Sequence, residues 1–440
     1  MNDMLIKTVS CERLDERYVR VEHPSGLPIL VFPKQMHTMS AMVVVRYGAQ
    51  DIRFGVDGVV PHAYPSGVAH YLEHQLFTRG DEGTVDEQFS SLGAEINAWT
   101  DYEKTAYTVS TSDHALTVLE NLLTFVTHPT FTERSVQKEQ GIIAQEIRMV
   151  ADDPWDMLHR RAMAALYPHH PTTHGICGSE RSIAAITPEI LYACYHAFYT
   201  PENMYLVVCG DVTVEQVVEV VDRVLPSKTD APTVKRGRDG GYDPRMPVLR
   251  KYEGVGSVSK PIFEILWRDD HCPTDPAARL QHAVAMDVLS ELLFSRAGCL
   301  YNRLLDEELI TMTYSYGYTT MQGIAYHCVS GESDQPQKVL QRYFEIIDEI
   351  RKEGLSYADF ERNRRVAYAG FVSEFDDTEE IADVMVDSEG DGVGVFDRLP
   401  IIDGLTQEQL QTLLDQTLDA QHTTLAVLYP QENEQEKEQK

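Results

Sequence analysis

The sequence predicts an α/β protein of two similar halves, each a mainly antiparallel sheet with helices packed mostly on one face. The chain has 440 residues, which is more than a single hydrophobic core usually holds. Short apolar runs typical of strands alternate with longer segments of helical period, and this order recurs weakly in the second half. Between the two series, residues 226–256 are rich in Lys, Arg, Gly, Asp and Pro, which is typical of a domain boundary.

We therefore expect a first half over residues 1–228, a linker over 229–256, a second half over 257–430 and a tail over 431–440. The tail is charged and poor in apolar residues, so we expect it to be disordered.

The elements of the first half follow from hydrophobic period and from turn and cap residues. A turn at residues 24–26 joins the first two strands in a hairpin, and the apolar run 42–47 predicts a strand buried on both faces. Residues 51–66, rich in Gly and Pro, predict a loop, and the histidine within it at position 62 is not assigned to a site. Strands are predicted at 18–22, 27–32, 42–47, 92–100, 107–110 and 207–211, and helices at about 113–127, 133–150, 155–167, 187–197 and 213–224.

In the second half, residues 261–267 predict a strand, and residues 277–294, 343–351 and 357–374 predict helices.

The composition limits the classes of partner. The net charge is −31, so nucleic acid and anionic membrane surfaces are excluded as partners. No apolar run is long enough for a membrane span, and the N-terminus has no signal-peptide pattern. The seven cysteines are scattered without a Cys-x-x-Cys pair, which predicts reduced, mostly core residues of a cytoplasmic protein. The acidity either favours basic peptides or only keeps the protein soluble.

The most informative stretch is residues 65–77, which contains His-x-x-Glu-His. With Ser66 as its cap and Gly80 as its stop, the stretch predicts a helix that presents His70, Glu73 and His74 on one face. Two imidazoles one turn apart suit a zinc ion with an open position for water, and Glu73 would act as general base. The alternative is a pair of histidines held by core hydrogen bonds.

A second helix supplies carboxylates. Residues 132–150 have a helical period, with Thr132 as cap and Pro154 beyond the end. Glu139 and Glu146 lie on the stripe that should be buried, where a carboxylate is costly unless it is paired or bound to metal. The alternative is that both carboxylates pair with arginines.

At this point the chain resembles the pitrilysin/insulinase family of zinc metallopeptidases, including its bacterial processing-peptidase-like members. The resemblance rests on the motif at 70–74, on Glu139 followed by Glu146, and on two further segments. Residues 92–100 are similar to the family's Gly-Ala-x-x-Asn-Ala-x-Thr strand, and residues 199–204 to its Tyr-x-Pro-x-Asn-Met segment.

The resemblance implies roles for these residues. His70, His74 and Glu146 would be the ligands of Zn²⁺, Glu73 the general base and Glu139 a carboxylate that supports the site. Asn97 and Ala98 would lie on a strand beside the backbone of a bound peptide. The family also implies that the two halves form a clamshell, that a second clamshell completes a chamber, and that the His-Pro segment at residues 167–171 is structural.

One departure from the family predicts a partner. Self-sufficient members carry an Arg and, seven residues later, a Tyr in the second half, and these bind the substrate carbonyl. Here Tyr314, Tyr316 and Tyr318 are candidates, but none has an Arg at that spacing, and Arg303 is followed at that spacing by Ile310.

We therefore expect a zinc-dependent endopeptidase that acts on peptides or unfolded segments, with the missing pair supplied by a related subunit or a homodimer. The alternatives are a non-catalytic scaffold subunit and a maturation factor dedicated to one peptide or protein.

Overall fold

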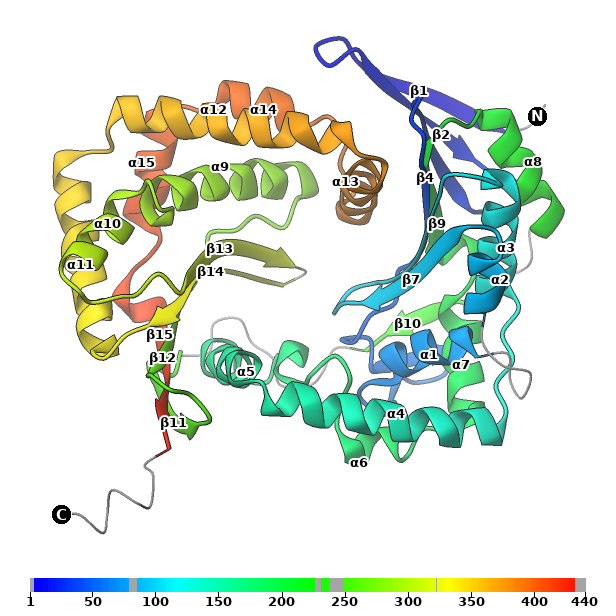
Figure 1. The fold of residues 1–440 in the computed structure, drawn as a ribbon, viewed down its shortest axis with the longest axis horizontal. Helices are drawn as coiled ribbons and strands as arrows, with labels where there is room; N and C mark the ends of the chain where they lie inside the picture. Colours follow the sequence, from blue (N-terminus) through cyan, green and yellow to red (C-terminus); the bar gives the residue numbers. More distant parts are fainter. Residues whose placement is uncertain (1–3, 79–84, 226–230, 238–247, 322, 432–440) are drawn as a thin grey trace. The chain divides into compact units, whose positions relative to one another are not determined.

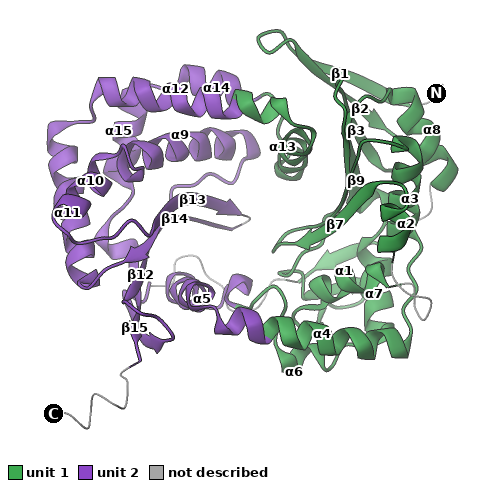
Figure 2. Ribbon diagram, in the orientation of Figure 1, with its two compact units in different colours: residues 1–147, 174–239, 372–396 green, residues 148–173, 240–371, 397–440 purple. Residues whose placement is uncertain are grey.

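The structure is a computed structural model that describes residues 4–78, 85–225, 231–237, 248–321 and 323–431. The chain divides into two compact units, coloured separately in Figure 2. Unit 1 consists of residues 1–147, 174–239 and 372–396, and unit 2 of residues 148–173, 240–371 and 397–440. The two halves expected from composition remain a prediction. The compact units do not coincide with them, because residues 148–173 belong to unit 2 and residues 372–396 belong to unit 1.

Unit 1 is built on a seven-stranded sheet in the order β1-β2-β3-β9-β4-β8-β7 (Figure 1). All neighbouring strands are antiparallel except β3 and β9, which are parallel. The strands are β1 Leu5–Cys11, β2 Glu16–Glu22, β3 Pro28–Pro33, β4 Met39–Val45, β7 Ala94–Thr100, β8 Thr105–Thr111 and β9 Met204–Gly210.

Strand β4 is buried along its whole length because both of its faces are covered. Ala41, Val43 and Val45 belong to the core shared with helices α3 (Ala115–Thr127) and α8 (Val214–Val224). Helix α13 (Thr378–Asp391) packs on β4 and β9 as well, and Figure 1 shows it on the opposite side of the sheet from α3 and α8. The helices therefore lie mostly, but not only, on one face.

The helices that carry the histidines and acidic residues are α1 (Val68–Phe77) and α4 (Glu133–Asp152). The predicted cap of α1 was wrong: Gly67 is the N-cap with φ of 87°, a left-handed conformation that favours glycine over serine. The predicted stop at Gly80 lies outside the described residues. The cap of α4 is confirmed, since the Ser135 backbone N–H donates to Thr132 Oγ1 at 3.0 Å.

Most other predicted elements of the first half are present. Pro154 begins α5 (Pro154–Leu166), and Thr187 and Thr213 cap α7 (Pro188–Phe198) and α8. The predicted loop 51–66 was wrong in part, because it contributes β5 (Arg53–Val56) and β6 (His62–Ala63) to a small sheet with β10 (Val234–Arg236). The remaining short elements of unit 1 are α2 Asp86–Ser90, α6 Glu180–Ile183, η2 Pro201–Asn203 and η3 Glu374–Asp376.

Unit 2 has a five-stranded sheet in the order β11-β15-β12-β14-β13, in which only β11 and β15 are parallel. Helix α5 packs on β12 and β15, while α9 packs on β13 and α11 on β12 and β15. The strands are β11 Lys251–Gly256, β12 Ile262–Arg268, β13 Tyr314–Met321, β14 Ile324–Glu332 and β15 Thr423–Pro430. The helices are α9 Pro276–Phe294, α10 Cys299–Asp306, α11 Pro336–Glu353, α12 Tyr357–Ser373, α14 Arg398–Gly404 and α15 Gln407–Gln416, with the short η1 Pro171–Thr173 and η4 Ala420–His422.

The predicted fold class is confirmed: each unit is a mainly antiparallel sheet with packed helices. Among the described residues, no helix combines the length and the apolar character that crossing a membrane requires.

Candidate functional site

The motif residues share one face of α1, which lies beside β7 and α7 in unit 1 (Figure 1). The imidazole rings of His70 and His74 are 4.6 Å apart between centroids. His70 and Glu73 are each only 8% exposed. Polar groups of this kind are rarely buried without a partner, so their surroundings decide their role.

Helix α4 supplies two of those partners. It is docked on α1 by Gln75, whose side-chain amide donates to the carbonyl of Ser135 at 3.2 Å and accepts from the Ser135 hydroxyl at 3.0 Å. One carboxylate oxygen of Glu146 lies 3.5 Å from Nε2 of His70, and the other lies 3.5 Å from Nε2 of His74. Both predicted acidic residues contact histidines of α1, which disfavours the alternative of arginine pairing.

Glu139 occupies the other side of His74. Its Oε1 lies 2.9 Å from Nδ1 of His74, and the Glu139 residue is only 6% exposed. A carboxylate only accepts hydrogen bonds when ionised, so Nδ1 is the donor and Nε2 of the neutral ring carries the free lone pair.

The carboxylate of Glu73 is held by strand β7. The Thr100 hydroxyl donates to Oε2 of Glu73 at 2.6 Å. Burial raises the pKa of Glu73, while the Thr100 hydrogen bond and nearby His74 lower it in part. Thr100 was not singled out from the sequence, because strand pairing alone does not show which α1 residue it touches.

The two histidines have opposite electrostatic surroundings. Burial, assisted by neighbouring His74, lowers the pKa of His70 to about 3, so this ring is neutral and able to bind a metal. Burial also disfavours the charged form of His74, but the hydrogen bond to Glu139 and the charges of three carboxylates outweigh it and raise the pKa of His74. This surplus of negative charge suits a divalent cation.

The donor set fits zinc. Donors about 2.0–2.1 Å from a tetrahedral zinc ion lie about 3.4 Å from one another. The contacts between Glu146 and the two imidazoles, 3.5 Å each, match that spacing. The Nδ1 atom of His70 is buried without a hydrogen-bond partner among the described residues. In the described part of the chain, two overlapping groups could hold a metal: His70 with Glu73 and His74, and His70 with Glu146 and Cys177.

Cys177 is a site residue that the sequence did not predict. Its Sγ lies 3.9 Å from Nε2 of His70 and 3.7 Å from Oε1 of Glu146. The expectation that the cysteines are mostly core residues was wrong: none of the seven is in a disulfide, but only Cys194 and Cys209 are fully buried. No pattern in the sequence links Cys177 to the motif, because the cysteine stands about a hundred positions beyond it.

The predicted peptide-binding residues lie on β7, the last strand of the unit 1 sheet. Asn97 is exposed and Ala98 is half-buried. The Asn97 side chain accepts a hydrogen bond from the Ala98 backbone N–H at 2.9 Å. Because β7 also carries Thr100, which contacts Glu73, a strand added at this edge would run past the general-base candidate.

The predicted tyrosines lie on β13 in unit 2, described here by itself. The Tyr314 hydroxyl lies 2.8 Å from that of Tyr343, and the Tyr316 hydroxyl donates to Glu291 at 2.6 Å. Arg303 pairs with Glu349 at 2.5 Å between Nη1 and Oε2. These hydroxyls and this guanidinium therefore have partners within their own unit.

Other polar features of unit 2 are accounted for by local contacts. His282, on α9, lies 2.6 Å from the buried carboxylate of Asp269, which also accepts from Tyr318 at 2.7 Å. In the His-Pro segment, Nδ1 of buried His170 lies 2.8 Å from the Thr172 hydroxyl.

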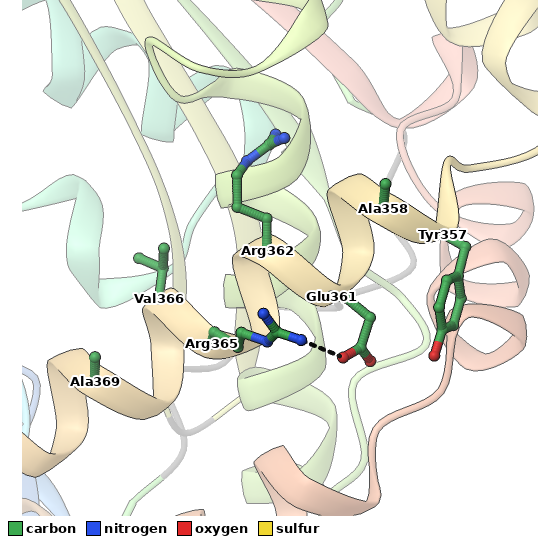
Figure 3. A pocket seen from close by; sticks show the side chains of 7 residues that line it. All are labelled: Tyr357, Ala358, Glu361, Arg362, Arg365, Val366 and Ala369. Carbon is green, nitrogen blue, oxygen red and sulfur yellow. Dashed lines mark ion pairs between the residues drawn. The ribbon is translucent and has the colours of Figure 1, made fainter.

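An open hollow of about 710 Å³ on α12 is lined by Arg365 and Glu361, which pair at 3.8 Å, and by their helix neighbours (Figure 3). It contains none of the predicted site residues.

The sequence of the chain was compared with family models and with known proteins. Residues 62–179 match the model described as insulinase (peptidase family M16), and residues 185–366 match the one described as peptidase M16 inactive domain. The chain is 30% identical to a Bacillus subtilis protein named uncharacterized zinc protease YmfH, over 97% of this chain and 100% of that protein. It is 26% identical to uncharacterized zinc protease ML0855 of Mycobacterium leprae, over 88% of this chain and 87% of that protein.

A solved structure agrees. A crystal structure described as an M16-like peptidase from Alicyclobacillus acidocaldarius superposes with a TM-score of 0.86 at 26% identity, covering 98% of this chain and 99% of that one. Together with the buried His70, Glu73 and His74 cluster, these likenesses lead to one conclusion. The chain belongs to the insulinase family of peptidases, family M16.

Proposed function

We propose that this chain is the zinc-bearing subunit of a metalloendopeptidase that hydrolyses peptides or unfolded segments. The observation that carries the proposal is the convergence of His70, His74 and Glu146 on one small volume, with Glu73 beside them. His70, His74 and Glu146 would hold the metal. Zinc, when bound, would polarise the scissile carbonyl and lower the pKa of water at the site.

Glu73 would take the proton from the attacking water and return it to the leaving amine. The Thr100 hydroxyl, 2.6 Å from the Glu73 carboxylate, would orient it while leaving one carboxylate oxygen for the water. Glu139 would hold the His74 ring in the tautomer that offers Nε2 to the metal. The edge of β7 would align the peptide through Asn97 and Ala98.

The two-chain arrangement rests on a different observation. The sequence has no Arg and Tyr pair at the family spacing, and Tyr314, Tyr316 and Arg303 have partners within unit 2. We infer that a related subunit, or a second copy of the chain, supplies the pair that binds the substrate carbonyl. A cytoplasmic location remains a prediction.

The test is digestion of a mixed peptide library by the zinc-loaded chain, with and without candidate partners. Glu73→Gln is the matched control, because it keeps the size of the side chain but removes the base, and we expect a loss of about 100-fold or more. Cleavage that needs a partner would support the two-chain proposal, and cleavage by the chain alone would contradict it.

A scaffold role is the second candidate, and the match of residues 185–366 to a model described as an inactive domain favours it. A wild-type chain without bound zinc, and without cleavage in any pairing, would support that role. Cleavage of one dedicated peptide or protein, and of nothing else, would instead support a maturation factor.

A further inference from the structure

We propose that Cys177 is a fourth protein donor at the metal centre, a thiolate that competes with water for the open position. This inference rests on the proposed function, because it concerns the same metal. It adds a means of control: while Cys177 holds the metal, no water can bind there and the peptidase is latent.

The sulfur of Cys177 lies beside two of the proposed metal ligands. Sγ of Cys177 contacts the same two atoms, Nε2 of His70 and Oε1 of Glu146, that contact one another. The three separations are 3.9, 3.7 and 3.5 Å. A sulfur about 2.3 Å and a nitrogen about 2.1 Å from one tetrahedral zinc lie about 3.6 Å apart. The separations between Cys177, His70 and Glu146 are therefore close to those of three donors that share one metal ion.

His70 is the buried histidine beside this sulfur. His70 is only 8% exposed, and its Nδ1 has no hydrogen-bond partner among the described residues. Its other nitrogen faces the sulfur and the Glu146 carboxylate. The nitrogen that faces the sulfur and the carboxylate is Nε2, and imidazole nitrogen, thiolate sulfur and carboxylate oxygen are the donors that zinc binds in proteins.

Close backbone packing fixes the position of Cys177. A Cβ on Gly67 would lie 2.3 Å from the Cys177 carbonyl oxygen, and a Cβ on Gly178 would lie 2.4 Å from the Ser66 carbonyl oxygen. The start of α1 and the segment around Cys177 thus pack backbone to backbone at two reciprocal glycines. The backbone contact between Gly67, the N-cap of α1, and Cys177 therefore holds the cysteine beside His70.

The chemistry of the donor set gives the consequence. Thiolate is a preferred zinc ligand, and a zinc site with four protein donors is closed, whereas a catalytic site keeps one position for water. Hydrolysis would therefore require that the thiolate leave the metal. Alkylation of Cys177 would prevent its return, and replacement of Cys177 would open the site permanently.

The experiment uses the full chain loaded with Co²⁺ in place of zinc, because a thiolate bound to cobalt gives a charge-transfer absorption in the near ultraviolet. We expect this absorption in the wild type and in Cys11→Ala, a matched control in unit 1, and its loss in Cys177→Ala. We also expect zinc to protect Cys177 from alkylation, as measured by mass spectrometry of the labelled peptides. With the partner that the proposed function requires, peptide turnover by Cys177→Ala should exceed that of the wild type.

The outcomes separate this inference from the proposed function. Bound cobalt without the charge-transfer absorption, together with peptidase activity that depends on Glu73, would overturn the role of Cys177 and leave the peptidase intact. A chain that binds neither cobalt nor zinc would overturn both. Cys177→Ser provides a second variant if Cys177→Ala does not fold, and retention of the absorption in either folded variant would also refute the proposal.

Discussion

His74 and Glu139 are joined by a 2.9 Å hydrogen bond between Nδ1 and a carboxylate oxygen, at a position where Glu139 is almost fully buried. The bond fixes both the plane and the tautomer of the ring, so that Nε2 faces Glu146 at 3.5 Å. Under the proposed function, Glu139 would therefore act on the metal through His74, without contributing a donor of its own.

The first prediction concerns this hydrogen bond. In Glu139→Gln the side chain keeps its size but loses its charge, so it orients His74 less firmly. We expect zinc affinity to fall by about 10- to 100-fold, the usual effect of losing a partner of a metal-bound histidine. Competition with a chromogenic chelator measures the affinity. Glu133→Gln, an exposed change on the same helix, should leave it unaltered; equal affinities in both variants would contradict the role of Glu139.

The second prediction concerns removal of the metal. Without a cation, the carboxylates of Glu73, Glu139 and Glu146 crowd two imidazoles, and a bound metal stabilises the folded chain by mass action. At a free zinc concentration about 100 times the Kd, the expected gain is about 2.7 kcal/mol. Chelation should lower the Tm of the wild type. In His70→Ala the Tm should respond to neither zinc nor chelator, and an equal response in that variant would place the metal elsewhere.

The third prediction concerns pH. Burial raises the pKa of Glu73, and the Thr100 hydroxyl opposes that rise by stabilising the charged carboxylate. Thr100→Val removes the hydroxyl at nearly constant size, so the pKa of Glu73 rises further. Because the base must be ionised to accept a proton, the acid limb of kcat/KM against pH should move to higher pH. Thr108→Val, on the neighbouring strand, is the control; an unmoved limb in Thr100→Val would exclude Glu73 as the titrating base.

The part of the site that could be predicted depends on local spacing. His70, Glu73 and His74 fall within one helical turn and a half, so their common face follows from the helical period alone. The burial of Glu139 followed from the apolar residues around it on α4. These positions need no knowledge of how distant segments meet.

The part that could not be predicted depends on tertiary contacts. Cys177 reaches His70 because Gly67 and Gly178 pack closely, and no sequence pattern records that approach. The exchange of segments between units has the same origin. Residues 148–173 join unit 2 and residues 372–396 join unit 1, so composition along the chain could not place them.

The fourth prediction tests the close packing at the start of α1. Gly67→Ala combines a φ of 87° with a Cβ only 2.3 Å from the Cys177 carbonyl oxygen. Gly58→Ala has a similar φ of 84°, but no atom of the described residues lies within 4 Å of the new Cβ. Gly58→Ala should cost about 1 kcal/mol of unfolding free energy for the backbone conformation alone, and Gly67→Ala clearly more. Urea unfolding measures both; equal losses would mean that the packing has relaxed.

The fifth prediction concerns α13, which comes from the C-terminal part of the chain but belongs to unit 1. Glu389 on this helix pairs with Arg20 and with Arg46, the latter at 3.0 Å, and its side chain is 13% exposed. Asp387, two residues earlier, pairs with Lys104 at 2.8 Å but is 69% exposed.

Burial decides which of these pairs contributes to stability. Glu389→Ala removes the shared and largely buried partner of two half-buried arginines, so we expect a loss of about 1–3 kcal/mol in the free energy of unfolding. Asp387→Ala removes a solvated ion pair and should cost less than about 1 kcal/mol. Denaturant titration of both variants gives the comparison. If Glu389→Ala is as stable as Asp387→Ala, the apolar contacts of α13 with β4 and β9, and not its ion pairs, hold it on the sheet of unit 1.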